Sequence, residues 1–200
     1  MPIRGPKVKI SRALNLALTP KAARIMERRA FSPGQHGAGR KRSPSVYKTQ
    51  MVEKQRLKFT YNISEAHLRK AYAKAGSMAG ATGANLVSLL ERRLDAAVLR
   101  MGFAKTCYAA RQYCAHGHFE VNGSRAFNGS QLLKVGDVVS VREKSQNHGQ
   151  IKEAAASAPT IPPYLEVDSA KLTGKLISIP EREQVPVEVT EQLVVEFYSR

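Results

Sequence analysis

Cysteine and acidic residues are scarce in this chain of 200 residues, and tryptophan is absent. Two cysteines, Cys107 and Cys114, exclude a framework of disulfides and favour a reducing, cytoplasmic compartment. No apolar run approaches the roughly 18 residues that a membrane-spanning helix needs, and the N-terminus lacks the apolar stretch of a signal peptide. Aromatic residues make up only 6% of the chain, which argues against a platform for stacked single-stranded bases.

Positive charge is the abundant feature. Thirty-two lysines and arginines face sixteen acidic residues, giving a net charge of +16. Residues 1–60 hold 15 of the basic groups and 2 of the acidic ones, whereas residues 151–200 are net acidic. This gradient favours a polyanionic partner, nucleic acid before an anionic membrane surface. The membrane reading is the weaker one, because the best amphipathic stretch, 86–101, carries acids on its polar side.

The first 43 residues read as a basic arm, because prolines and glycines are frequent there and few apolar positions recur with a period. Such an arm is either a solvated, disordered tail or a segment that folds against nucleic acid. On the second interpretation, the arm residues expected to contact nucleic-acid phosphates are Lys7, Lys9, Arg12, Arg40, Lys41 and Arg42.

Apolar spacing and turn residues outline the folded part. Helices are predicted over residues 45–58, 64–75, 86–101 (capped by Asn85), 107–115 (capped by Thr106) and 151–158. A hairpin is predicted at Asn122-Gly123, and further strands over 138–142, 165–167 and 176–179. Residues 193–197 read as a strand or as a segment packed on the body. The small, flexible stretch 76–84 predicts a domain boundary.

An α+β fold in three parts follows. We predict a basic N-terminal arm (1–43), a small helical domain (44–84) on which residues 190–200 pack back, and an α+β domain (85–189) with a core at 85–144. This last domain is expected to place helices before a small, mostly antiparallel sheet.

Residues 85–142 resemble the S-four RNA-binding module, named after the fourth protein of the small ribosomal subunit. The match lies in Leu-x-x-Arg-Leu-Asp (90–95), Ala-Arg-Gln (110–112), His-Gly-His (116–118), Val-Asn-Gly (121–123) and Val-Gly-Asp-Val-Val (135–139). Outside the module, Pro-Gly-Gln-His-Gly (33–37), Glu-Lys-Gln-Arg (53–56), Arg-Lys-Ala-Tyr (69–72) and the ending 195–200 resemble the ribosomal S-four family itself, of bacterial or organellar type.

The resemblance implies a structural constituent of the small ribosomal subunit. Such a protein is a primary binder of small-subunit ribosomal RNA, helps nucleate subunit assembly, contributes to translational accuracy and lies beside neighbouring small-subunit proteins. It implies no catalysis, no cofactor and no small-molecule substrate. Carried over onto this sequence, the RNA-binding residues are Gln35, His36, Lys54, Arg56, Arg69, Lys70, Lys105, Arg111, His116, Asn122 and Arg125.

Two other classes of protein also contain the S-four module. Pseudouridine synthases contain it beside a catalytic domain, but the remaining residues here are mostly arm, helices and a short tail. A free-standing RNA-binding stress or assembly factor would share the module without needing the arm or the matching C-terminus.

Two constellations that point to other chemistry have simpler interpretations. Glu91 and Asp95 are spaced like a pair of catalytic carboxylates, but Arg92 and Arg93 between them predict ion pairs at a surface or domain boundary. The triplet Cys114-x-His116-x-His118 looks like a ligand set without a fourth member. Some family members bind zinc through N-terminal cysteines, which residues 1–106 lack, so no metal is expected.

Overall fold

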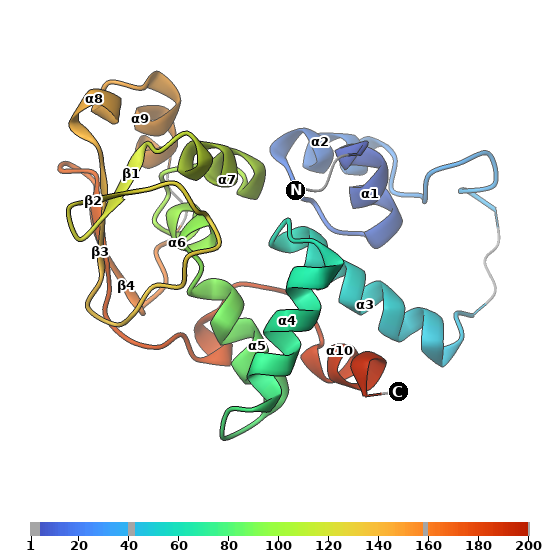
Figure 1. Ribbon diagram of the computed structural model, residues 1–200. Coiled ribbons are helices and arrows are strands. Elements are labelled where there is room, and N and C mark those ends of the chain that lie inside the picture. The colour runs from blue at the N-terminus through green and yellow to red at the C-terminus, as the bar shows by residue number, and fades with distance from the viewer. Residues whose placement is uncertain (1–4, 40–42, 158–159, 200) are drawn as a thin grey trace. The chain divides into compact units, whose positions relative to one another are not determined.

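The computed structural model describes residues 5–39, 43–157 and 160–199, and the chain divides into two compact units (Figure 1). The first unit contains the residues up to Ala73 together with those from Val187 onward, and the second contains residues 74–186. The α+β class predicted from the sequence is confirmed, with helices first and a small antiparallel sheet after them. The predicted division at residues 43, 84 and 189 stays a prediction.

The first unit consists of packed helices. They are α1 (Lys7–Leu14), α2 (Pro20–Arg28), α3 (Val46–Thr60), most of α4 (Glu65–Gly76) and α10 (Glu191–Tyr198). Helix α1 packs against α2, and α10, in red, lies along α3 (Figure 1). The Gln50 amide donates to the Glu196 carboxylate at 2.8 Å, which joins α3 to α10. Of the two alternatives predicted for residues 193–197, the packed segment is confirmed and the strand is wrong, because these residues form a helix that packs on α3.

Residues 7–28 form two helices, so the prediction that this stretch lacks periodic apolar positions is wrong. Thr19 caps α2, because its hydroxyl accepts a hydrogen bond from the Ala22 N–H at 3.2 Å, and Pro20 opens the first turn. Ala22 is fully buried, and Ile25 is half-buried. With only nine residues in α2, the apolar spacing is too short to stand out from the surrounding basic residues.

The second unit joins helices to a five-stranded antiparallel sheet of order β2-β1-β3-β5-β4. The strands are β1 (Phe119–Val121), β2 (Ser124–Ala126), β3 (Val138–Val141), β4 (Leu165–Asp168) and β5 (Thr173–Leu176). The helices are α5 (Thr82–Glu91), α6 (Leu94–Arg100), α7 (Cys107–Ala115), α8 (Glu143–Gln146) and α9 (Gly149–Ala156), followed by a 3-10 turn at Arg182–Gln184.

The predicted hairpin is confirmed at the turn between β1 and β2. Asn122 and Gly123 adopt φ of 50° and 77°, the left-handed backbone that a two-residue hairpin turn requires. The turn sets the register, in which Phe119 faces Ala126. Phe119 is fully buried, and its ring stacks on that of Phe103 at 6.2 Å between centres. The sheet therefore packs its inner face against the residues that follow α6.

The single helix predicted over residues 86–101 is two helices, α5 and α6. The chain turns at Arg93, whose backbone is extended (φ −69°, ψ 143°). There the N–H of Leu94 donates to the carbonyl of Gln131 at 2.8 Å instead of continuing the helical ladder. Asn85, predicted as the cap, lies inside α5. The break comes from a partner far along the chain, which apolar spacing does not report.

Replacing Leu90 with Ala should lower the free energy of unfolding by roughly 2–5 kcal/mol, because this α5 side chain is 2% exposed and its loss leaves a cavity. The measurement is urea unfolding followed by circular dichroism. Val135→Ala is the matched control, since that side chain is 51% exposed and its truncation should change stability by no more than about 0.5 kcal/mol. Equal stability of wild type and Leu90→Ala would show that the apolar stripe is not a core.

Candidate nucleic-acid interface

The N-terminal residues expected to contact RNA differ in exposure. Lys7 and Lys9 are exposed on α1. Arg12 is half-buried, and its guanidinium donates to the Phe31 carbonyl at 2.9 and 3.1 Å while lying 5.0 Å from the centre of the Phe31 ring. Arg12 therefore fastens α1 to the segment after α2. Gln35 and His36 are exposed. The predicted contacts at Arg40, Lys41 and Arg42 lie outside the described residues.

The α3 residues carried over from the family lie within the first unit. Lys54 is 5% exposed, with its ammonium 3.0 Å from the Glu65 carboxylate and 4.8 Å from the centre of the Phe197 ring. The Arg56 guanidinium donates to the carbonyl of Leu14 at 3.1 Å. Both side chains thus hold helices together, and any RNA contact by them would compete with these partners. Their RNA contacts stay predictions.

Helix α4 presents basic groups outward. Arg69 and Lys70 are exposed, and neither forms an ion pair with a described residue. Glu65, four residues before Arg69 on the same helix, already contacts Lys54 and Tyr198. Burial opposes its ionisation, but hydrogen bonds from Tyr198 and Lys54 prevail and hold the pKa of Glu65 below its usual value. Among the described residues, Arg69 and Lys70 are therefore exposed cations that no carboxylate pairs with.

In the second unit, Arg125 and the end of α7 meet. The Arg125 guanidinium donates to the carbonyls of Gly117 at 3.2 Å and His116 at 3.3 Å, and lies 4.3 Å from the centre of the Phe127 ring. His116 and Arg125 are both exposed and therefore form one basic patch beside the hairpin. Asn122 is exposed at the hairpin turn, where its amide donates to the Asp137 carboxylate at 2.9 Å.

The other two residues predicted on α7 and just before it have acidic partners. Lys105 is exposed and pairs with the carboxylate of Glu153. Arg111 is half-buried, with its guanidinium 3.4 Å from the Asp95 carboxylate. Lys105 can exchange a solvated carboxylate for a phosphate at little cost, because exposed ion pairs contribute little stability. Arg111 is constrained more strongly, since its partner is buried.

The ion pairs predicted for Glu91 and Asp95 are present, but both carboxylates are buried, so the surface alternative is wrong. Glu91, 2% exposed, receives hydrogen bonds from both arms of the Arg100 guanidinium at 2.7 and 3.1 Å. Asp95, 5% exposed, is held by Arg93 at 2.7 and 3.0 Å and also faces Arg111. Glu91 thus pairs with the following helix rather than with its sequence neighbours. Each carboxylate is engaged by a two-pronged guanidinium, which is the geometry of a structural ion pair.

Three histidine rings gather near the basic patch, of which sequence reasoning selected only His116. The ring of His118 lies 5.9 Å from that of His116 and 5.4 Å from that of His148, centre to centre. Burial, reinforced by the two neighbouring histidines and by Arg125 and Arg142, lowers the pKa of His118. The sequence places His118 two residues after His116, in the ligand-like triplet, but no sequence pattern brings His148 to this place.

The described residues hold no group of three or more histidine, cysteine or acidic side chains placed to bind a metal ion. Cys114 is fully buried, and burial raises the pKa of its thiol to about 12, so it packs as a small apolar side chain. Over the same residues, every helix is too short or too polar to cross a bilayer.

Comparison with known proteins accounts for nearly the whole sequence. Residues 2–91 match the family described as ribosomal protein S4/S9 N-terminal domain, and residues 92–139 match the S4 domain. The small ribosomal subunit protein uS4 of Chlorobium phaeobacteroides is 46% identical over 199 residues, covering 98% of each chain. The uS4 proteins of Micrococcus luteus (96% of this chain, 95% of the relative) and Streptomyces avermitilis (98% and 97%) are each 48% identical.

Acidification below about pH 6.5 should lower the free energy of unfolding, because the folded-state pKa of His118 lies below its unfolded value. The unfolded chain then takes up the proton first, so stability present above about pH 6.5 is lost as the pH falls through the folded pKa. Urea unfolding at about pH 7.5 and about pH 5 measures the difference.

The matched variant is His118→Asn, which keeps a polar group for Ser145, whose hydroxyl lies 2.9 Å from Nδ1 of His118, but removes the titrating ring. Its loss of stability between the two pH values should be smaller than that of the wild type. The same loss in both proteins would exclude His118 as a source of the pH dependence.

Proposed function

The chain belongs to the uS4 family of small ribosomal subunit proteins, and from this membership we propose that it is a structural constituent of the small ribosomal subunit that binds the ribosomal RNA of that subunit. The observation that carries the proposal is the 46–48% identity to uS4 proteins along almost the full length of both chains. A match of that extent includes both units and is not limited to a shared RNA-binding module.

The charge distribution supports RNA as the ligand. Structured RNA is recognised through its phosphates, 2′-hydroxyls and shape, which calls for arginine and lysine on rigid elements. Arg69 and Lys70 on α4, and Arg125 beside His116, supply such groups at exposed positions. Lys54, Arg56 and Arg12 contribute indirectly, because their contacts fix the helices that carry the exposed groups.

Assembly and accuracy are the finer part of the proposal. A protein that binds rRNA without help from other proteins orders the RNA early, and we propose that this chain helps nucleate assembly of the small subunit and contributes to translational accuracy. Its further partners are neighbouring small-subunit proteins, and its place is the cytoplasmic ribosome. We assign it no catalytic activity, since the relatives are named as ribosomal proteins.

The proposal is tested with purified chain and an in vitro transcript of bacterial small-subunit rRNA, by filter binding at near-physiological potassium and magnesium. We expect saturable binding in the absence of any other protein, with an affinity that falls as salt rises. Co-sedimentation with small subunits after a high-salt wash separates this function from that of a free RNA-binding factor. Release into the soluble fraction would favour the free factor, and conversion of uridine to pseudouridine in the transcript would indicate an enzyme.

The double variant Arg69→Gln/Lys70→Gln should bind the same transcript more weakly, by roughly 1.5–3 kcal/mol for each well-made charge-assisted contact. Its melting temperature should stay close to that of the wild type, because both side chains are exposed. Lys144→Gln/Lys175→Gln removes the same charge from exposed positions outside the proposed contacts and is the control. Equal weakening in the two variants would assign the effect to net charge rather than to α4.

A further inference from the structure

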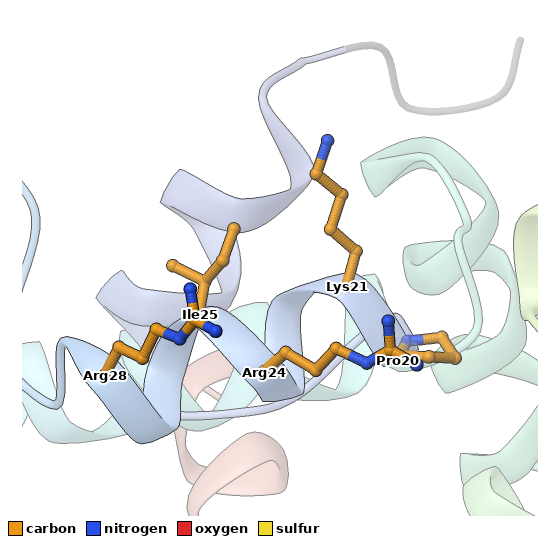
Figure 2. Close-up of a pocket in the computed structure, with 5 residues that line it drawn as sticks. All are labelled: Pro20, Lys21, Arg24, Ile25 and Arg28. Atoms are coloured by element: carbon orange, nitrogen blue, oxygen red, sulfur yellow. The ribbon is translucent and has the colours of Figure 1, made fainter.

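We propose that the outer face of α2 is a phosphate-binding site for double-helical RNA, formed by Lys21, Arg24 and Arg28. This inference rests on the proposed rRNA-binding function and adds a contact surface to it. None of the three residues belongs to the RNA-binding set derived from the sequence. Together with Pro20 and Ile25 they line a hollow of about 520 Å³ on the surface of the first unit (Figure 2).

Helix α2 buries one side and exposes its basic side chains on another. Ala22, fully buried, lies on the inner side, and α2 packs against α1. Positions 20, 24 and 28 are four residues apart, so they follow one another along the opposite side of the helix. Figure 2 shows the Arg24 and Arg28 side chains lying along the helix toward its N-terminal end, while that of Lys21 extends away from it.

The three cations are uncommitted within the described structure. Lys21, Arg24 and Arg28 are exposed, and none of them forms an ion pair with a described residue. The one acid on this helix, Glu27, is exposed and is not part of the hollow's lining. Lys54, Arg93 and Arg100 differ in this respect, because each of them already pairs with a carboxylate. The three cations of α2 are therefore available to bind a phosphate. Three like charges gathered on one short helix repel one another, and a bound phosphate would relieve that repulsion.

The side chains on this face of α2 are suited to binding a phosphate backbone. The side chains of Arg24 and Arg28 lie one helical turn apart, about 5–6 Å between their Cβ atoms, a spacing that suits successive phosphates of one strand. Guanidinium forks bind phosphate oxygens through two N–H groups at once. The lining contains neither an aromatic ring for base stacking nor an amide for reading a base edge. RNA in double-helical form presents its phosphates in such a row and is recognised by shape rather than sequence.

The test compares the salt dependence of binding in two variants of the full chain. In Lys21→Gln/Arg24→Gln/Arg28→Gln, binding to the small-subunit rRNA transcript should weaken by roughly 10- to 100-fold near physiological salt, and the slope of log affinity against log salt should fall by about 2 to 3. Glutamine keeps the helix propensity of these exposed positions. Lys134→Gln/Lys144→Gln/Lys175→Gln removes equal charge from exposed positions of the second unit and should change the slope by less than about 1.

A second probe separates this inference from the function on which it rests. It is a 20-base-pair RNA duplex of unrelated sequence, which should also lose affinity in the α2 variant. If the wild type binds the transcript and the α2 variant keeps its affinity and salt slope, or loses no more than the control, the α2 site is excluded while the proposed function stands.

The remaining outcomes are also decisive. If the wild type ignores the transcript but binds the duplex through α2, the ribosomal proposal fails and the phosphate site remains. Binding to neither probe overturns both. Circular dichroism and thermal melting establish that the triple variant is folded. Should it unfold, Arg24→Gln alone replaces it, with an expected slope decrease of about 0.9, and an unchanged slope in that variant excludes the site.

Discussion

Sixteen carboxylates share this chain with thirty-two lysines and arginines, and the cations that the carboxylates occupy determine which cations remain for a ligand. In the described residues, several acids are withdrawn into the folded units, where Glu65 pairs with Lys54 and Glu91 with Arg100. Each such pair removes one acid and one cation together, so the net charge of +16 is carried by the cations that have no internal partner. The internal ion pairs therefore determine which cations remain for a ligand, while the composition sets how many there are.

Asp95 is a buried carboxylate that pairs with two arginines from different elements. The bidentate pair with Arg93 lies where α5 gives way to α6, and Arg111 reaches the same carboxylate from α7. A buried ion pair contributes little net stability compared with apolar packing, but losing one partner leaves a buried charge without compensation. Removing either arginine would therefore be costly, because it would leave the buried Asp95 carboxylate with fewer partners. It also means that an RNA contact at Arg111 would be made by a side chain that the fold already needs.

The sequence predicts a structural feature correctly where that feature depends only on a few neighbouring residues. Asn122-Gly123 demands a left-handed turn, and Thr106 caps α7 through its own hydroxyl, which accepts from the Ala109 N–H at 3.1 Å, so both features follow from a few neighbouring residues. The break at Arg93 was not predictable in this way, because it depends on a hydrogen bond to Gln131. The same holds for the candidate site, where His148 joins His118 only through the fold.

Family resemblance transfers the type of a residue but not its exposure, as Lys54 demonstrates. The buried side of α3 includes Gln50, Glu53, Lys54 and Leu57, which follow helical spacing but are mostly polar. The hydrophobicity pattern therefore shows no buried face on α3, because most of the residues on that face are polar. Their partners on and before α10 are polar too, and include Glu196 and the Thr190 N–H that donates to Glu53. Helix α2 has the opposite arrangement, with the apolar Ala22 buried and the cations Lys21, Arg24 and Arg28 exposed. A basic residue on a helix thus becomes a candidate for RNA contact only once the partner of the helix's inner face is known, and that partner is supplied by tertiary structure.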